Sequence, residues 1–198
     1  IAGASLRDLM SFTHKSLLRR DVASGRYQIH ELLRQYAEEK LRATDQLAPL
    51  QDTHSAYYLT TLHARQSEML TAKALPFLND IAQDLENVAI AAQWAASHAA
   101  YARLDGALRS VWFYYTASGE FLLGNDMFMR LVSLLDGQKA SDERDQTISR
   151  CLLWGAQALL STHNTTAAAP VVERAQSLII ATTPADLRAH FAYIHGLW

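Results

Sequence analysis

The chain has 198 residues, a formal charge of −2 and 49% apolar residues, a composition that argues against a disordered polypeptide. Its one cysteine, Cys151, excludes an internal disulfide and favours a reducing compartment, so we expect a cytoplasmic location. No segment approaches the roughly 20 apolar residues that span a bilayer, and the N-terminal residues lack the pattern of a signal peptide.

Charge is spread unevenly along the chain. Eight basic and five acidic residues through Ala43 give this part a charge of +3, so the remainder carries −5. A basic head on an acidic body is compatible with nucleic acid near the head. The excess is small and the cations do not cluster, which favours ordinary solvated surface.

The first 44 residues predict a short α/β segment. Ser5 can cap a helix, because Asp8 follows it in the position of a capping box. Gly25 can adopt the positive φ that closes a hairpin. The expected elements are a helix over 5–15, strands over 17–20 and 26–29, and an amphipathic helix over 31–43.

Beyond this segment the pattern predicts helices only. Residues 44–51, with Asp45 and Pro49, are expected as a linker. Pro76 is expected to interrupt the helical region, and Asn79 or Asp80 to cap the helix that follows. The expected helices are 52–71, 80–98, the pair 103–116 and 121–135, the pair 143–161 and 166–181, and a last helix after Pro184.

The two helix pairs resemble each other when the turn at Gly119 is placed over the turn at His163, and they resemble tetratricopeptide repeats. That family places small residues at helix crossings and aromatics between paired helices. Two features depart from it: Trp112 stands where a small residue is usual, and the 44-residue spacing of the turns exceeds the family's period of about 34. The matching positions are Tyr115, Gly124 and Phe128 in the first pair and Ala156, Ala168 and Ala175 in the second.

Longer segments resemble STAND-type bacterial transcriptional regulators, which are large signal-transduction ATPases. GASLRDLMSFTHKSLLRRD and GRYQIHELLRQYAEEKL resemble the end of their winged helix. DIAQDLENVAIAAQWAASH, with Glu86-Asn87, Ala91 and Trp94, resembles the helix that opens their superhelical repeats. The resemblance implies a mainly α fold. Residues 1–44 would be the C-terminal part of a winged-helix domain with one β-hairpin, and residues 45–198 a truncated α-α superhelix of tetratricopeptide-like hairpins.

The resemblance also implies a function. We expect a non-catalytic sensor or protein-interaction segment that binds an effector or partner on its repeats and relays binding through the winged helix. ATP and Mg²⁺ would bind an upstream domain of the same polypeptide, because this chain contains no G-x-x-x-x-G-K-[ST] motif. The expected partners are that nucleotide-binding domain and a protein or small-molecule effector, with no membrane.

The stripe that faces the concave side of such an array is the candidate binding surface. Arg109 and Phe113 lie four residues apart on it, and Arg150, Leu153 and Gln157 form the equivalent stripe of the next pair. The alternative is that other helices cover these residues.

The hairpin offers a different function. Arg19, Arg20 and Arg26 on the wing could contact a phosphate backbone, which would make this a nucleic-acid-binding winged helix. We favour an intramolecular relay for this segment over direct contact with DNA.

Catalytic and metal-binding patterns are weak. His30-Glu31 lacks the second histidine of a zinc motif, because Arg34 occupies that position, and no other histidine has ligand spacing. Cys151 and His163 lack a third group to orient them, so a structural thiol is expected. We therefore expect neither an enzyme nor a metal site. Self-association is expected through Phe191, Ile194 and Trp198.

Overall fold

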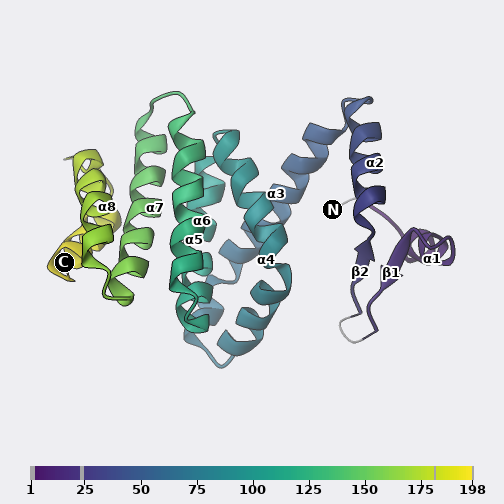
Figure 1. The fold of residues 1–198 in the computed structure, drawn as a ribbon, viewed down its shortest axis with the longest axis horizontal. Helices are drawn as coiled ribbons and strands as arrows, with labels where there is room; N and C mark the ends of the chain where they lie inside the picture. Colours follow the sequence, from purple (N-terminus) through teal and green to yellow (C-terminus); the bar gives the residue numbers. More distant parts are fainter. Residues whose placement is uncertain (1–2, 23–24, 181, 198) are drawn as a thin grey trace. The chain divides into compact units, whose positions relative to one another are not determined.

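A computed structural model describes residues 3–22, 25–180 and 182–197 (Figure 1). This part of the chain is mainly helical and contains one two-stranded antiparallel sheet, which confirms the expected mainly α class with a single hairpin. The chain divides into two compact units, Ile1–His54 and Ser55–Trp198, and the division falls inside the helix α3 (Leu47–Ala64).

The N-terminal unit contains the four elements that its sequence predicts. Ser5 and Asp8 form the capping box, in which Asp8 N donates to Ser5 Oγ over 3.2 Å and Ser5 N donates to Asp8 Oδ2 over 2.9 Å. Gly25 closes the hairpin with φ at 70°, and Leu18 pairs with Ile29. The elements are α1 (Leu6–His14), β1 (Leu18–Arg20), β2 (Tyr27–Ile29) and α2 (Glu31–Arg42).

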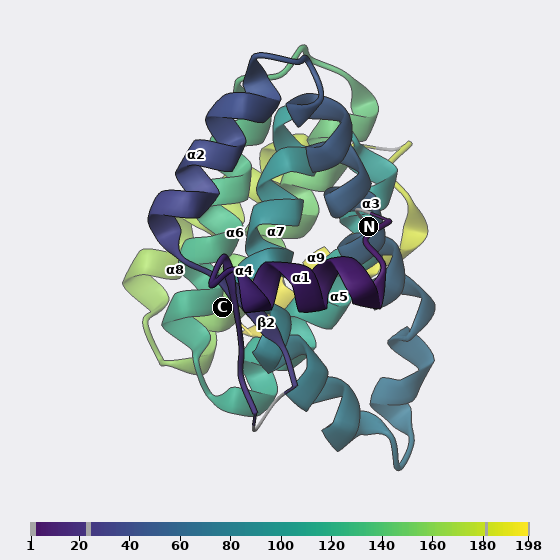
Figure 2. The ribbon, with the colours of Figure 1, turned by 90° about the vertical axis from the view of Figure 1, so that its right-hand side faces the viewer.

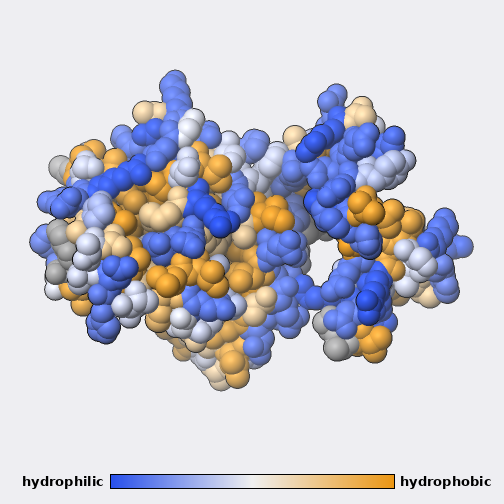
Figure 3. Space-filling model, viewed as in Figure 1, coloured by the Kyte–Doolittle hydropathy of each residue, from blue (hydrophilic) through white to orange (hydrophobic). Residues whose placement is uncertain are grey.

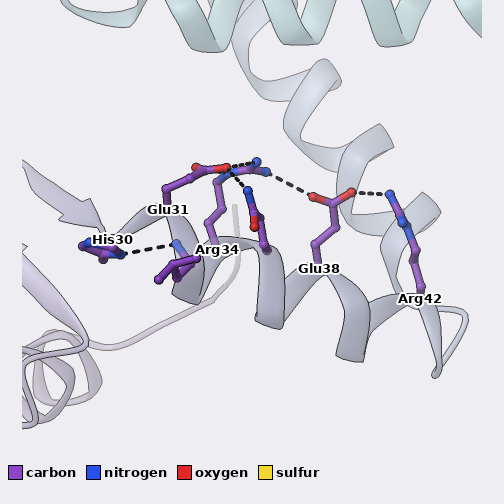
Figure 4. A network of polar contacts seen from close by, with 7 residues as sticks. His30, Glu31, Arg34, Glu38 and Arg42 are labelled. Carbon is purple, nitrogen blue, oxygen red and sulfur yellow. Dashed lines mark hydrogen bonds and ion pairs between the residues drawn. The ribbon is translucent and has the colours of Figure 1, made fainter.

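A chain of ion pairs runs along the solvent face of α2 (Figure 4). Arg34 lies 2.7 Å from Glu31 and 3.1 Å from Glu38, and Glu38 in turn lies 2.5 Å from Arg42. The hydrogen bonds from Arg34 are the main reason that the pKa of Glu31 falls to about 2. These pairs are exposed and link residues three or four apart, so they support the helix but do not anchor it to another element.

The N-terminal unit has no interior of its own within the described residues 3–22 and 25–54, because none of them is buried. Leu6, Leu32 and Tyr36 on the two helices are 67%, 68% and 58% exposed, and Figure 3 shows apolar surface in orange. The capping and hairpin signals therefore set local structure here without a packed core behind them.

The elements that follow α3 in the described part of the chain build the C-terminal unit together with the end of α3. Each helix packs on its neighbour in the chain, while α5 also contacts α7, α7 contacts α9, and α4 contacts α6 (Figures 1 and 2). Elements of this unit therefore contact alternate as well as successive elements. The elements after α3 are the 3₁₀ helix η1 (Gln66–Leu70), α4 (Ala74–Ser97), α5 (Tyr101–Ser118), α6 (Phe121–Asp136), α7 (Asp142–Ser161), α8 (Thr165–Leu178) and α9 (Ala185–Leu197).

Two expected breaks are helical in the structure. Helix α3 begins at Leu47, so most of the expected linker 44–51 is helix, and α4 begins at Ala74 instead of after Pro76. Pro49 and Pro76 each occupy a first turn. A proline there removes an N–H that has no partner within the helix, so it costs little.

Small residues and buried hydroxyls hold the C-terminal unit together. A Cβ on Gly124 would lie 3.0 Å from Cβ of Tyr115, which shows how closely α6 approaches α5. Ser55 Oγ donates to Ala91 O over 2.8 Å, and both residues are buried. The expected crossing residues Ala156, Ala168 and Ala175 are all fully buried. Among the described helices, none is both long and apolar enough to cross a membrane.

Candidate ligand-binding groove

Three alternate helices of the C-terminal unit, α5, α7 and α9, enclose a hollow of about 370 Å³ together with η1; we call it the aromatic groove. On α5, α7 and α9 its residues recur at spacings of three or four, which places them on one face of each helix. The lining residues are Met69 and Leu70 from η1, Arg109, Trp112, Phe113 and Thr116 from α5, Trp154 and Gln157 from α7, and His190 and Tyr193 from α9.

Stacked rings form one wall of the aromatic groove. The Trp112 and Trp154 rings lie 5.3 Å apart with their planes inclined by 22°, and the His190 ring lies 4.2 Å from Trp154. Trp112 is buried, whereas Trp154 is half-buried. The three rings come from α5, α7 and α9, so the wall depends on the packing of all three helices.

The polar groups of the groove are few. His190 Nε2 donates to Gln157 Oε1 over 3.3 Å, an orientation that leaves the Gln157 amide nitrogen as a donor. Burial lowers the pKa of His190 to about 4, so its ring is neutral at pH 7. Arg109 is exposed and has no ion pair or hydrogen bond with any described residue.

A second cavity of about 500 Å³ adjoins the aromatic groove and shares Arg109, Trp154 and His190 with it. Arg150 bridges two helices here, with Nε 3.4 Å from Asp105 Oδ2 on α5 and Nη1 2.7 Å from Asp186 Oδ2 on α9. Burial raises the pKa of Asp105 to about 6 and outweighs the opposing charge of Arg150.

η1 and the end of α3 are tied to α5 at the floor of this second cavity. The Gly106 carbonyl accepts from the Gln66 side-chain amide and from His63 Nδ1, the latter over 3.1 Å. Because a carbonyl only accepts, His63 carries its proton on Nδ1. The lack of a side chain on Gly106 permits this approach, since a Cβ there would lie 3.1 Å from the same imidazole nitrogen.

The structure places the predicted stripe in three different surroundings. Arg109, Phe113 and Gln157 line the aromatic groove, whereas Arg150 lies in the adjoining cavity between its two carboxylates. Leu153 is fully buried in the core, so its expected place on a binding surface is wrong. On α7 the aromatic groove is lined by positions 154 and 157, and Leu153 lies one residue away from that face.

Sequence reasoning missed seven of the ten lining residues, namely Trp112, Trp154, His190, Tyr193, Thr116, Met69 and Leu70. Helical spacing could have found the first two, because Trp112 follows Arg109 by three residues and Trp154 precedes Gln157 by three. No local pattern connects α9 to this site. Its contribution depends on how the chain returns after Pro184.

The three arginines of the alternative nucleic-acid surface do not gather on one face. Arg19 and Arg20 are exposed neighbours on β1, so their side chains point to opposite faces of the ribbon. Arg26 is half-buried and already interacts with another residue. The register places Arg26 opposite Asp21, on the face of Arg19, so the three arginines are divided between the two faces of the ribbon.

Other candidate residues lie apart from the groove. Cys151 is fully buried and its pKa is raised by that burial, while His163 is an exposed turn residue with φ at 58°. Ile194 is buried, so its expected role in self-association is wrong, and Phe191 packs on the core; Trp198 lies outside the described residues. No three His, Cys, Asp or Glu side chains of the described part gather as metal ligands.

The chain matches no known family model, no curated protein and no solved structure. What the aromatic groove can do therefore follows from its own side chains. They supply aromatic faces, an unpaired guanidinium and an amide donor, and the ten lining residues include neither a carboxylate nor a thiol.

Proposed function

We propose that this chain is a non-catalytic sensor or protein-interaction segment of a larger STAND-type signalling ATPase or transcriptional regulator. It would comprise the end of a winged helix followed by tetratricopeptide-like hairpins, and it would act in the cytoplasm. ATP and Mg²⁺ would bind the upstream nucleotide-binding domain of the same polypeptide. The sequence segments that resemble this family, in their order along the chain, support the assignment.

The aromatic groove is the observation that carries the proposal. It is lined by three helices that alternate in the chain, and a ligand in it would touch all three at once. A ligand that fits one packing of α5, α7 and α9 better than another shifts the population toward that packing. Differential binding of this kind is how a segment without catalytic groups can report on an effector.

The N-terminal unit is proposed as the relay. The exposed apolar side chains of α1 and α2 supply area for contact with the upstream domain, and no described residue of this unit is buried in the isolated chain. A unit held only by local hydrogen bonds and a hairpin can change its packing at small cost. Direct contact with DNA is the less favoured role, because Arg19 and Arg20 face opposite sides of the strand.

Hydrogen exchange on the intact chain tests the sensing part. Small apolar and aromatic compounds that stabilise the protein in a thermal-shift screen should slow exchange in α5, α7 and α9 together. Phe113→Ala should weaken this protection, whereas Tyr57→Ala, a change of an exposed residue on α3, should not. Stabilising compounds that protect only other helices would contradict the assignment of the groove.

Duplex binding tests the alternative. At low salt, we compare the fluorescence anisotropy of a labelled DNA duplex with the unmodified protein and with the double variant Arg19→Gln, Arg20→Gln. Any change in anisotropy should be the same for both proteins. Tight, salt-dependent binding that this variant eliminates would replace the relay by a nucleic-acid function.

A further inference from the structure

We propose that the aromatic groove selects a small amphipathic carboxylate, that is, an aromatic or otherwise apolar body that bears one carboxylate. The apolar body would lie against Trp154 and Phe113, and the carboxylate would pair with Arg109. This inference rests on the proposed function in that it takes the groove as the ligand site, and it adds the chemical class of the ligand.

The charges around the groove favour an anionic ligand. Arg109 is the one charged side chain among the ten lining residues at pH 7, because His190 is neutral there. Arg150 in the adjoining cavity forms ion pairs with Asp105 and Asp186, so its charge is already balanced by two carboxylates. The planar guanidinium of Arg109 matches the geometry of a carboxylate, which can accept two parallel hydrogen bonds from it.

The walls of the groove favour a ligand with an apolar body. Apart from Arg109, the groove is lined by aromatic rings, two apolar residues of η1 and a few hydroxyl and amide groups. A volume of about 370 Å³ lies near the lower end of the range for small-molecule sites, which are apolar with a few placed polar groups. The Gln157 amide nitrogen adds a neutral donor to the same groove. The Arg109 guanidinium and the Gln157 amide carry N–H donors that have no partner among the described residues, so acceptor atoms on the ligand are favoured beside them.

A cationic ligand is the opposite case. Tryptophan faces attract cations, but Arg109 already supplies a positive charge and no lining residue supplies a carboxylate to offset a second one. Charge complementarity therefore distinguishes ligands that share the same ring system. A series that differs only in the charged group isolates this term.

The test uses 2-naphthoate, 2-naphthamide and 2-naphthylmethylamine, titrated into the full chain at pH 7 and low salt by calorimetry. We expect the carboxylate to bind at least about 10-fold more tightly than the amide, and the amine to bind most weakly. Arg109→Gln should reduce the carboxylate to the affinity of the amide and leave the amide unchanged. Arg130→Gln, an exposed arginine on α6 outside the groove, should keep the full preference.

The outcomes separate this inference from the proposed function. Equal binding of carboxylate and amide to the unmodified protein, or a preference that survives Arg109→Gln, overturns the ligand class while the groove remains a binding site. Failure of all three naphthyl compounds to bind counts against the groove itself. Binding that occurs only with dimer formation in sedimentation assigns the groove to a second copy of the chain. Tighter binding of an acetyl-Trp-Glu-amide peptide than of naphthoate assigns it to a peptide partner. Either of these results also overturns the small-molecule proposal.

Discussion

Trp112 on α5 and Trp154 on α7 stack with their ring centroids 5.3 Å apart. Trp112 is only 8% exposed, so its ring serves both the core and the wall of the aromatic groove. Stacked aromatic pairs contribute beyond the area that they bury. The stability of the C-terminal unit and the shape of its groove therefore depend on the same side chain.

Trp112→Ala should lower the free energy of unfolding by about 3 kcal/mol, because it removes a large buried ring and leaves a cavity against Trp154. Urea unfolding followed by far-ultraviolet circular dichroism measures the change. Tyr193→Ala is the matched control on the groove, since that ring is exposed, and it should change stability by less than about 0.5 kcal/mol. Similar losses for both variants would show that the stack adds nothing to the fold.

Gly124 and Gly196 form a second matched pair. Both are helical, but a Cβ on Gly124 would lie 3.0 Å from Cβ and Cγ of Tyr115, whereas a Cβ on Gly196 would meet nothing within 4 Å. Gly124→Ala should therefore destabilise the protein by about 1 kcal/mol or more, because overpacking exceeds the gain in helix propensity. Gly196→Ala should be neutral or stabilise by a few tenths of a kcal/mol.

Thermal unfolding of the two alanine variants gives the comparison directly. The melting temperature of the Gly124 variant should fall and that of the Gly196 variant should stay or rise. A higher melting temperature for both variants would mean that α6 can move away from Tyr115 without a loss of stability. The close approach of the two helices would then not require glycine at position 124.

The sequence was sufficient where a signal is local. The capping box of Ser5 and Asp8 and the turn at Gly25 involve residues a few positions apart, and both form as expected. The small residues Gly124 and Ala156 also lie where their size predicts: Gly124 at the close approach of α6 to Tyr115, and Ala156 fully buried. The breaks predicted at Pro49 and Pro76 are wrong, because proline disrupts a helix interior but is tolerated in the first turn, where both residues lie.

Only part of the aromatic groove could be predicted from local sequence patterns. Arg109 and Phe113 follow from helical spacing on one helix, but Leu153 was assigned one residue away from the true face of α7. The facing positions depend on how each helix is rotated against its neighbours, which tertiary packing decides. The pairing of Trp154 with His190 joins helices far apart in sequence and has no local signature.

Arg150 should be essential for stability because it is the ion-pair partner of the largely buried Asp105. Arg150→Met should cost about 3 kcal/mol, since it leaves that carboxylate without a counter-charge. Asp186→Asn should cost less than about 1 kcal/mol, because this partner is exposed.

A double-variant cycle checks the assignment. Asp105→Asn should recover part of the loss caused by Arg150→Met, so the double variant should be more stable than the sum of the single changes predicts. Strict additivity in urea unfolding would indicate that the two side chains do not interact in solution.

Acid should act on the fold through two opposed groups, His190 and Asp105. The pKa of His190 falls from 6.5 to about 4 in the folded protein, so its contribution to stability is present above pH 6.5 and is lost as the pH falls toward 4. The pKa of Asp105 rises from 3.8 to about 6, so its contribution is present below pH 3.8 and is lost as the pH rises through 6. Arg150 and Asp186 face both groups.

A variant that lacks one of these two groups should therefore show the pH dependence of stability that the other group causes. Between pH 7 and pH 5, Asp105→Asn should make the protein lose roughly 1 kcal/mol more stability than the unmodified chain does, because only the histidine effect remains. His190→Gln should shift the slope the opposite way, with stability retained or increased on acidification. Urea unfolding of the three proteins at both pH values measures these differences, and the titration of all other groups cancels in the comparison. Parallel pH profiles for the three proteins would place both pKa values near those of the unfolded chain, so neither burial nor the bridge between α5, α7 and α9 would govern these two side chains.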